Sequence, residues 1–245
     1  MLLRRITDSI YYLPFEQRLD RPSLYYIKGS DYSVAIDAGT SKRHVEKFYE
    51  GIMELNFPLP ETTIITHWHW DHTFGLNGIH GKSLGYSLTN DILKNVQTWK
   101  WNEEDMKHRE ETGEDIPFCN EHILLEYPDL NEIEVKLLDK TIDSITIIDL
   151  GDRVLELIPR ATTHSDDSLF ILDKKDKVLF VGDAAGEDFY YNNQMYDEKK
   201  LRDLISFLES LDYNIYCDGH TGLYTKNEIL DHLRNILEED KIVTH

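Results

Sequence analysis

A short run of metal-binding residue types constrains this chain more than any other feature of its sequence. The run reads His67-Trp68-His69-Trp70-Asp71-His72 and directly follows an apolar stretch. Imidazole and carboxylate groups are ligands that suit zinc, iron and manganese. In an extended segment alternate side chains point to the same side, so His67 and His69 would face one position. A turn after them would bring Asp71 and His72 to an adjacent position, and one segment would then serve two metal ions.

The composition limits the number of domains and the classes of partner that this chain can have. The 245 residues are 40% hydrophobic and contain no linker-like or repetitive stretch, so we expect a single domain over residues 1–245. The net charge of −20, from 46 acidic and 26 basic residues, would repel phosphate backbones and anionic membranes. We therefore expect a small-molecule substrate, with no nucleic-acid or membrane partner.

Cysteine usage and the N-terminus bear on the compartment. Cys119 and Cys217 are too few for a disulfide framework. Residues 1–8 lack an apolar stretch of signal-peptide length, and no segment approaches the ~20 apolar residues of a membrane helix. These features predict a cytoplasmic protein.

The pattern of apolar residues predicts alternating strands and helices. Helices are expected at 42–55 and at about 198–211, and a last helix begins with the capping box Thr225…Glu228. Strands are predicted at 10–13, 23–27, 33–37, 62–66, 143–149, 154–159, 169–172, 178–181 and 214–217. This order suits two packed sheets with helices outside, although generic α/β layering gives a similar pattern.

Residues 86–131 differ from the rest and read as a helical insertion. An apolar stripe at helical spacing starts after Asn90, a plausible helix cap, and a strongly polar run follows it. Trp99 and Trp101 within this charged segment suggest a lid or a dimer contact, which leaves a homodimer open. Trp68 and Trp70 are expected to pack in the core or to wall the site, with substrate stacking as the alternative.

Further candidate ligands lie in loops that follow predicted strands. His164 comes after the strand at 154–159, Asp183 after the strand at 178–181, and His220 after the strand at 214–217. Loops on a rigid scaffold commonly present functional side chains. A lone loop histidine is usually a surface residue, but together with the run at 67–72 these three complete a set that could hold two ions. Cys217 is then expected to be a small buried residue.

The set His67-x-His69-x-Asp71-His72, His164, Asp183 and His220 resembles the metallo-β-lactamase-fold hydrolase superfamily, and Asp37 in Ile36-Asp37-Ala38-Gly39 resembles its early strand-end aspartate. The resemblance implies a four-layer αββα sandwich, here with the insertion at about 86–131. It implies that His67, His69 and His164 bind one metal and that Asp71, His72 and His220 bind the second. Asp183 would bridge both ions, and Asp37 would orient a ligand from outside the metal shell.

The chain departs from this family's pattern at two places. Thr163 precedes the third histidine where the family has glycine, and Asp166-Asp167 follow it; we expect these two aspartates to be solvated turn residues, with tuning of the site as the alternative. Acyl-homoserine lactonases, which the chain otherwise resembles, place a tyrosine three residues after the bridging aspartate. Gly186 stands there, although Tyr190 and Tyr191 are close.

The expected function is a dinuclear metal-dependent hydrolase acting on a small-molecule ester, thioester, lactone or amide through a metal-bridging hydroxide. Two divalent ions are expected, zinc first, with iron or manganese as alternatives. Asp71 would accept or pass on a proton. Competing interpretations are a mononuclear iron oxidoreductase of the persulfide dioxygenase type, a phosphodiesterase, and a non-catalytic metal-binding module.

Overall fold

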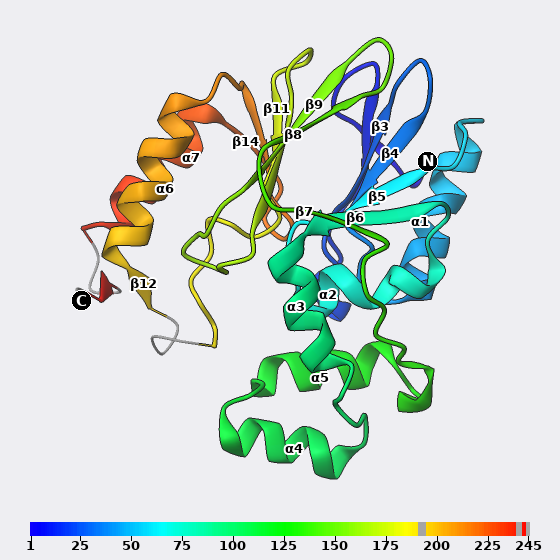
Figure 1. Ribbon diagram of the computed structural model, residues 1–245, viewed down its shortest axis with the longest axis vertical. Coiled ribbons are helices and arrows are strands. Elements are labelled where there is room, and N and C mark those ends of the chain that lie inside the picture. The colour runs from blue at the N-terminus through cyan, green and yellow to red at the C-terminus, as the bar shows by residue number, and fades with distance from the viewer. Residues whose placement is uncertain (191–194, 239–241, 244–245) are drawn as a thin grey trace.

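Two β-sheets packed face to face form the centre of the computed structural model, which describes residues 1–190, 195–238 and 242–243 (Figure 1). In the described residues the first sheet has seven strands, in the spatial order β1 (Arg4–Arg5), β2 (Ile10–Leu13), β3 (Leu24–Lys28), β4 (Ser33–Ile36), β5 (Thr62–Ile64), β6 (Lys82–Tyr86) and β7 (Lys140–Ile142). Strands β1 to β4 pair antiparallel, and β4 to β7 pair parallel.

The second sheet is antiparallel except at one pair. Within the described residues its six strands follow the order β14 (Leu223–Thr225), β13 (Ile215–Cys217), β11 (Val178–Phe180), β10 (Leu169–Asp173), β9 (Val154–Pro159) and β8 (Thr146–Asp149). Strands β11 and β13 are the parallel pair. A small separate ladder joins β12 (Tyr196–Asp197) to β15 (Ile242–Val243).

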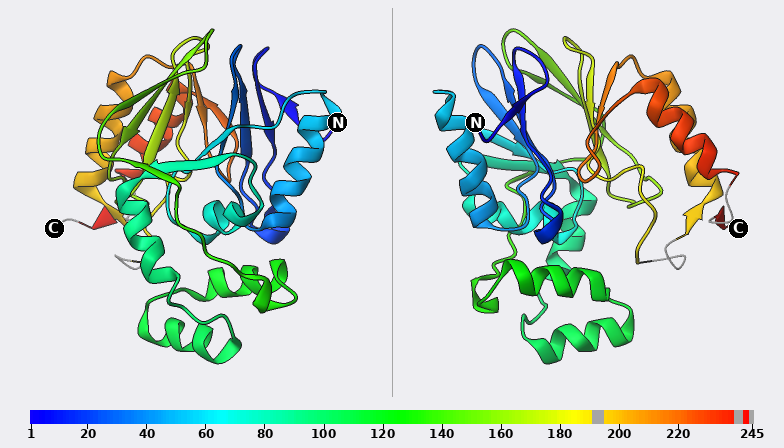
Figure 2. Two further views of the ribbon diagram at one scale, coloured as in Figure 1. Left: turned by 45° about the vertical axis from the view of Figure 1, so that its right-hand side comes forward. Right: turned by 180° about the vertical axis from the view of Figure 1, so that it is seen from behind.

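Helices cover the outer faces of both sheets. The α-helices are α1 (Lys42–Glu54), α2 (Trp70–Thr73), α3 (Ser87–Val96), α4 (Glu103–Thr112), α5 (Pro117–Glu126), α6 (Glu198–Ser210) and α7 (Lys226–Ile236), and the short 3₁₀ helices are η1 (Gln17–Leu19), η2 (Phe74–Gly78) and η3 (Leu130–Glu132). Helix α1 lies outside the first sheet and α6 and α7 lie outside the second (Figures 1 and 2). The layers are helix, sheet, sheet and helix, which confirms the predicted αββα sandwich.

The order of layers follows from where the apolar side chains point. Between the sheets, Ile36 and Ile64 of the first meet Leu157, Ile171 and Phe180 of the second. Other side chains of the same sheets point outward and pack on α1 or on α6 and α7. Because both faces of these strands are buried, they read as nearly continuous apolar runs.

Most of the predicted elements are present, and one predicted cap is wrong. Helices α1 and α6 lie within one residue of the predicted ranges, and Thr225 and Glu228 form the capping box of α7. Helix α3 begins at Ser87, so Asn90 lies inside it rather than at its start. The Asn90 side chain instead accepts a hydrogen bond from the Leu138 backbone N–H at 2.8 Å, which ties α3 to the approach of β7.

The segment predicted as an insertion contains α3, α4 and α5. Helix α3 packs on the sheet through the buried Leu93, whereas α4 and α5 lie beyond the strand ends (Figures 1 and 2). Its treatment as an insertion in one domain of residues 1–245 stays a prediction. None of the described helices is both long enough and apolar enough to span a membrane.

Strand direction brings the candidate residues to one edge of the sandwich. Strands β4 and β5 run parallel, so the loops after both emerge at the same edge. Strands β9 and β11 are each antiparallel to β10, and β11 is parallel to β13, so these three strands also share a direction. Asp37, the run at 67–72, His164, Asp183 and His220 follow these five strands.

Candidate metal centre

The first group of candidate ligands consists of three buried histidines. His67 and His69 lie in the loop after β5, and His164 lies in the loop after β9. His69 Nδ1 is 3.0 Å from His67 Nε2 and 3.0 Å from His164 Nε2. A ring nitrogen carries one proton or one lone pair, so it can make only one of these contacts as a hydrogen bond. Three nitrogens turned toward one point are instead the arrangement that a cation with imidazole ligands requires.

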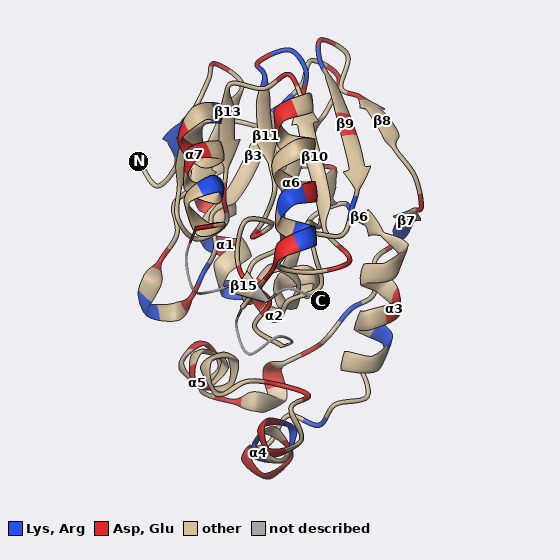
Figure 3. Cartoon of the chain, turned by 90° about the vertical axis from the view of Figure 1, so that its left-hand side faces the viewer, with Lys and Arg blue, Asp and Glu red and all other residues tan. Residues whose placement is uncertain are grey.

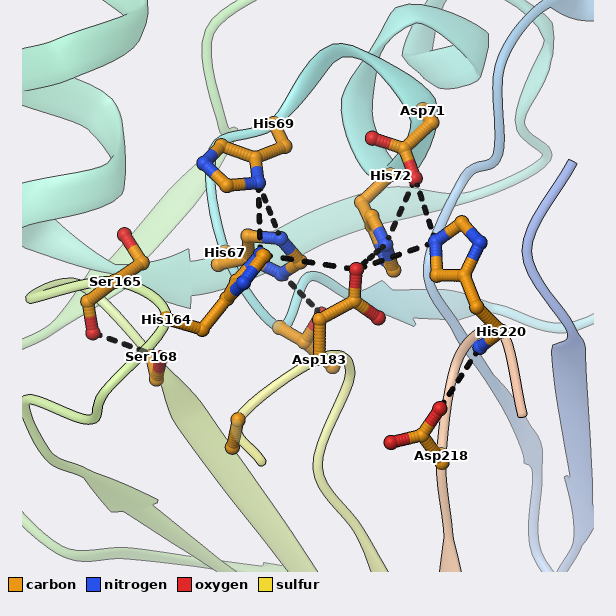
Figure 4. Close-up of polar contacts among 12 residues, drawn as sticks. His67, His69, Asp71, His72, His164, Ser165, Ser168, Asp183, Asp218 and His220 are labelled. Carbon is orange, nitrogen blue, oxygen red and sulfur yellow. Dashed lines mark hydrogen bonds and ion pairs between the residues drawn. The ribbon is translucent and has the colours of Figure 1, made fainter. Parts of the chain in front are cut away.

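The second group combines two carboxylates and two imidazoles. Asp71 and His72 form the first turn of α2, where the chain turns out of the extended run. Asp71 Oδ2 lies 3.1 Å from His72 Nε2 and 2.9 Å from His220 Nε2. Asp183 Oδ2 lies 3.3 Å from His72 Nε2 and 3.2 Å from His220 Nε2. Figure 4 shows this group beside the three histidines.

Asp183 stands between the two groups. Its Oδ2 atom is also 3.7 Å from His164 Nε2, so one carboxylate faces a histidine of each group. Gly219 provides the room for it, because a Cβ at that position would lie 2.3 Å from Asp183 Oδ1. All seven candidate residues therefore converge into two groups: His67, His69 and His164 in one, and Asp71, His72, Asp183 and His220 in the other. The family resemblance implied the same groups except that it placed Asp183 between both, and the binding of metal by these residues stays a prediction.

The protonation of the two groups differs. Burial, aided by neighbouring imidazoles, lowers the pKa of His67 and of His69 well below the usual value, so these rings are neutral and offer lone pairs. Burial also lowers the pKa of His72, but the carboxylates of Asp71 and Asp183 outweigh it and hold that pKa well above the usual value. Burial raises the pKa of Asp183, but His220 and His72 outweigh it, so the carboxylate is ionised.

The comparisons with known proteins agree with this geometry. The model of the family described as "Metallo-beta-lactamase superfamily" matches residues 18–220, most of the chain. This chain belongs to the metallo-β-lactamase superfamily. No curated protein matched the sequence.

Solved structures in the same superfamily have a similar fold at low sequence identity. A metallo-β-lactamase from Pontibacter korlensis superposes with a TM-score of 0.64 at 15% identity and covers 97% of this chain and 99% of its own. A metallo-β-lactamase family protein from Thermus thermophilus superposes with a TM-score of 0.66 at 15% sequence identity, and the match covers 96% of this chain and 81% of that protein. The DIM-1 metallo-β-lactamase superposes with a TM-score of 0.65 at 15% sequence identity, and the match covers 96% of each chain. These likenesses show the fold of the superfamily and leave the activity to be argued from the site.

The ring nitrogens that face away from the centre are also held. His72 Nδ1 lies 2.8 Å from Asp37 Oδ2, and Asp37 Oδ1 accepts a hydrogen bond from the Thr66 backbone N–H at 2.8 Å. His164 Nδ1 lies 3.0 Å from the Glu187 carbonyl oxygen, and His220 Nδ1 lies 3.2 Å from Asp20 Oδ1. Oxygen acceptors behind histidines fix the ring orientation and the tautomer, as metal sites generally need.

Two of these supporting groups were not predicted from the sequence. Asp20 ends η1 in the left-handed conformation, far from the other candidates along the chain, and no motif marks it. The acceptor for His164 is a backbone carbonyl, which has no residue signature at all. Asp37, by contrast, lies where the family resemblance placed it.

Asp166 and Asp167 were both predicted to be solvated turn residues, which is right for Asp166 and wrong for Asp167. Asp166 is exposed and pairs with Lys200 at 2.7 Å. Asp167 is fully buried, and its carboxylate accepts hydrogen bonds from Thr89 Oγ1 at 2.7 Å and Ser165 Oγ at 2.5 Å. It therefore connects α3 to the loop that presents His164, and burial raises its pKa to about 6.

The aromatic residues near the site have mainly packing roles. Trp70 is buried against Phe74, and the Trp68 ring centroid lies 4.7 Å from that of His69. Trp99 and Trp101 pack against the Arg109 guanidinium, whose carbon Cζ lies 4.6 Å from the Trp99 ring centroid and 4.8 Å from that of Trp101. Tyr190 lies beside His69, with ring centroids 5.3 Å apart, whereas Tyr191 is outside the described residues. Cys217 is buried between the sheets, as expected.

Proposed function

We propose that this protein is a dinuclear metal-dependent hydrolase that cleaves a small-molecule ester, thioester, lactone or amide. The observation that carries the proposal is the convergence of seven ligand-type side chains into two adjacent groups beside a cavity of about 910 Å³. His69, Asp71, His164, Asp183 and His220 line that cavity, so the centre is accessible to a small molecule.

The residues present fit two divalent cations. His67, His69 and His164 would hold one, Asp71, His72 and His220 would hold the other, and Asp183 would contact both. We propose zinc, with iron or manganese as the alternatives that the same nitrogen and oxygen donors accept. When bound, such ions lower the pKa of water toward neutrality and polarise a carbonyl group.

The side chains of this site have separable tasks in such a reaction. The neutral His67 and His69 donate lone pairs, and Asp37 keeps the His72 ring in place. Asp71 lines the cavity, and without metal the positive charges of His72 and His220 outweigh its burial and hold its pKa well below the usual value. Bound cations would take over that role and keep the carboxylate ionised. An ionised carboxylate in this place can accept a proton from water and pass it to the leaving group.

The proposal is tested by metal analysis together with a substrate screen. Protein purified without added metal is analysed by mass spectrometry, then assayed on ester, thioester, lactone, amide and phosphodiester substrates with each metal. We expect two divalent ions per chain at saturation and hydrolysis of an acyl substrate. His69→Ala and Asp183→Ala should bind less metal and lose activity by at least about a hundredfold.

A matched histidine variant provides the control. His108→Ala, in the exposed part of α4, removes an imidazole far from the cavity lining and should retain both metal and activity. Full hydrolytic activity in metal-free protein would contradict the proposal. So would one iron per chain with oxygen consumption on a persulfide substrate, or hydrolysis confined to phosphodiesters.

A further inference from the structure

The walls of the cavity are apolar and contain few groups that could pair with an anion. Phe15, Ile116, Phe118 and Phe189 contribute to them. The described residues that line the cavity include no Lys or Arg. Its charged side chains outside the two ligand groups are all carboxylates: Asp20, Glu187, Asp218 and Glu228.

Two arginines outside the cavity lining are already engaged with other side chains. Arg21, just after η1, donates to both carboxylate oxygens of the buried Glu126, at 3.0 and 2.9 Å. Arg109 is buried between Trp99 and Trp101. In α6 and α7, whose basic positions are blue in Figure 3, Lys200 pairs with Asp166, Arg202 with Glu198 and Arg234 with Glu209. None of these residues lines the cavity.

The carboxylates of the walls have fixed roles that keep them in place. Asp20 holds His220, and Asp218 accepts hydrogen bonds from the backbone N–H groups of His220 and Thr221 at 3.0 and 2.9 Å. A ligand carboxylate at these walls, away from the two ligand groups and from the imidazoles of His122 and His232, would therefore lose its water without gaining a Lys or Arg partner, and it would face like charges. Both effects disfavour an anion. The net charge of −20 opposes its approach as well.

One wall residue marks where an apolar group would lie. Phe118, near the start of α5, remains 47% exposed although it lines the cavity. The Phe15 ring lies on another wall, with its centroid 5.0 Å from that of His220. An apolar arm on the substrate would cover such aromatic surface and gain about 25 cal/mol per Å² buried.

We propose that the cavity selects uncharged acyl substrates with an apolar arm and discriminates against those whose arm ends in a carboxylate or phosphate. This inference rests on the proposed hydrolase function, because it concerns the substrate of that same site. It follows from the composition of the walls, and it does not depend on which metal is bound.

A matched pair of esters tests the inference. The acyl chains of p-nitrophenyl hexanoate and mono-p-nitrophenyl adipate have six carbons each and differ in ending with a methyl or a carboxylate. With metal-loaded protein at pH 8, we expect kcat/KM for the hexanoate to exceed that for the adipate by at least about tenfold. A ratio near one, or a preference for the adipate, would overturn the inference.

Binding provides a readout that is independent of turnover. Hexanamide and the monoamide of adipic acid are compared by saturation-transfer NMR, with metal-loaded and with chelator-treated protein. Hexanamide should bind more tightly to both. If neither ester is hydrolysed but this preference is found, the hydrolase proposal fails while the selectivity stands. If both esters are hydrolysed alike and both amides bind alike, the selectivity fails while the hydrolase proposal stands.

A single added cation should shift the selectivity. Gln17 lines the cavity from η1 and is not part of either ligand group, so Gln17→Lys places a positive charge on the wall. We expect it to raise the adipate-to-hexanoate ratio of kcat/KM at least about fivefold. Met53→Lys changes the net charge equally on the exposed end of α1, outside the cavity lining, and should leave the ratio unchanged. If the ratio shifted equally in both variants, the net charge of the protein would account for the effect, and the inference would be contradicted.

Discussion

At the scale of single residues, the seven candidate ligands predicted from the sequence lie together, whereas several of the residues that support them were not predicted. The run at 67–72 could be found because four residues of two ligand types lie within six positions, and His164, Asp183 and His220 could be found because each follows a predicted strand. Asp20 could not be found in this way, since its contact with His220 depends on the conformation of two distant loops. Asp167 was misjudged because an aspartate in a polar loop is usually solvated, and its burial is tolerable because Ser165 and Thr89, the latter from another element, donate hydrogen bonds to it.

Asp37 provides a test of this outer support. Its carboxylate holds both the His72 ring and the Thr66 backbone N–H, and its φ of 64° is one that aspartate and asparagine tolerate better than most residues. We expect Asp37→Ala to weaken zinc binding about 10–100-fold and Asp37→Asn to weaken it less, because the amide keeps the shape. Competition with a chromophoric chelator measures the zinc affinity of each variant. Asp166→Asn, at the exposed neighbour of Asp167, is the control, and an unchanged affinity in correctly folded Asp37→Ala would refute the role.

At the scale of elements, the amphipathic helices and most strands were predicted, but β6 and β7 were not. Helix α1 has an apolar stripe thirteen residues long, whereas β6 and β7 have only five and three residues and no clear alternation. Such strands are specified by their partners: β6 is paired on both sides, with β5 and β7. Asn90 resembled a cap because asparagine favours helix starts, but here its side chain satisfies a backbone N–H of another segment.

The helical segment α4–α5 should show a pH dependence that originates at Asp115. Burial raises the pKa of this carboxyl to about 6, although the Ile116 backbone N–H and Arg109 oppose that effect. The folded state therefore binds the proton more tightly than the unfolded state, whose aspartate pKa is about 3.9. The contribution to stability is largest below the unfolded pKa and is lost as pH rises to about 6, by on the order of 2–3 kcal/mol.

Asp115→Asn should remove this loss, because an amide keeps the acceptor for Ile116 N–H without titrating. Urea unfolding of both proteins at several pH values from 4 to 7 measures it. The stability of the variant relative to the natural protein should increase over this range. Glu111→Gln, on the exposed side of α4, should show no such increase. A difference between Asp115→Asn and the natural protein that is constant with pH would show that burial does not perturb this group.

At the scale of the whole molecule, the candidate centre joins the two sheets. Asp71 and His72 follow the first sheet through the loop after β5, whereas Asp183 and His220 follow strands of the second. The two sheets also meet through apolar contacts between their inner faces and through hydrogen bonds such as that from the Tyr25 hydroxyl to the Asp218 carbonyl oxygen at 2.7 Å. The order of the elements suited two packed sheets but also generic α/β layering, and the family resemblance was needed to choose, because strand patterns alone do not state which sheet a strand joins. Bound metal would add a polar link across this interface at its edge.

Metal should therefore stabilise the folded chain as a unit. A ligand at 100 times its Kd adds about 2.7 kcal/mol to the free energy of unfolding. For a protein of this size each kcal/mol shifts Tm by about 2–4 °C, so zinc should raise Tm by about 5–10 °C. Asp183→Ala, which lacks the carboxylate between the groups, should lose most of this rise, and His108→Ala should keep it. Differential scanning calorimetry with and without zinc measures both. If zinc raised Tm equally in Asp183→Ala, the metal would be bound elsewhere, and the link between the two sheets through this centre would be wrong.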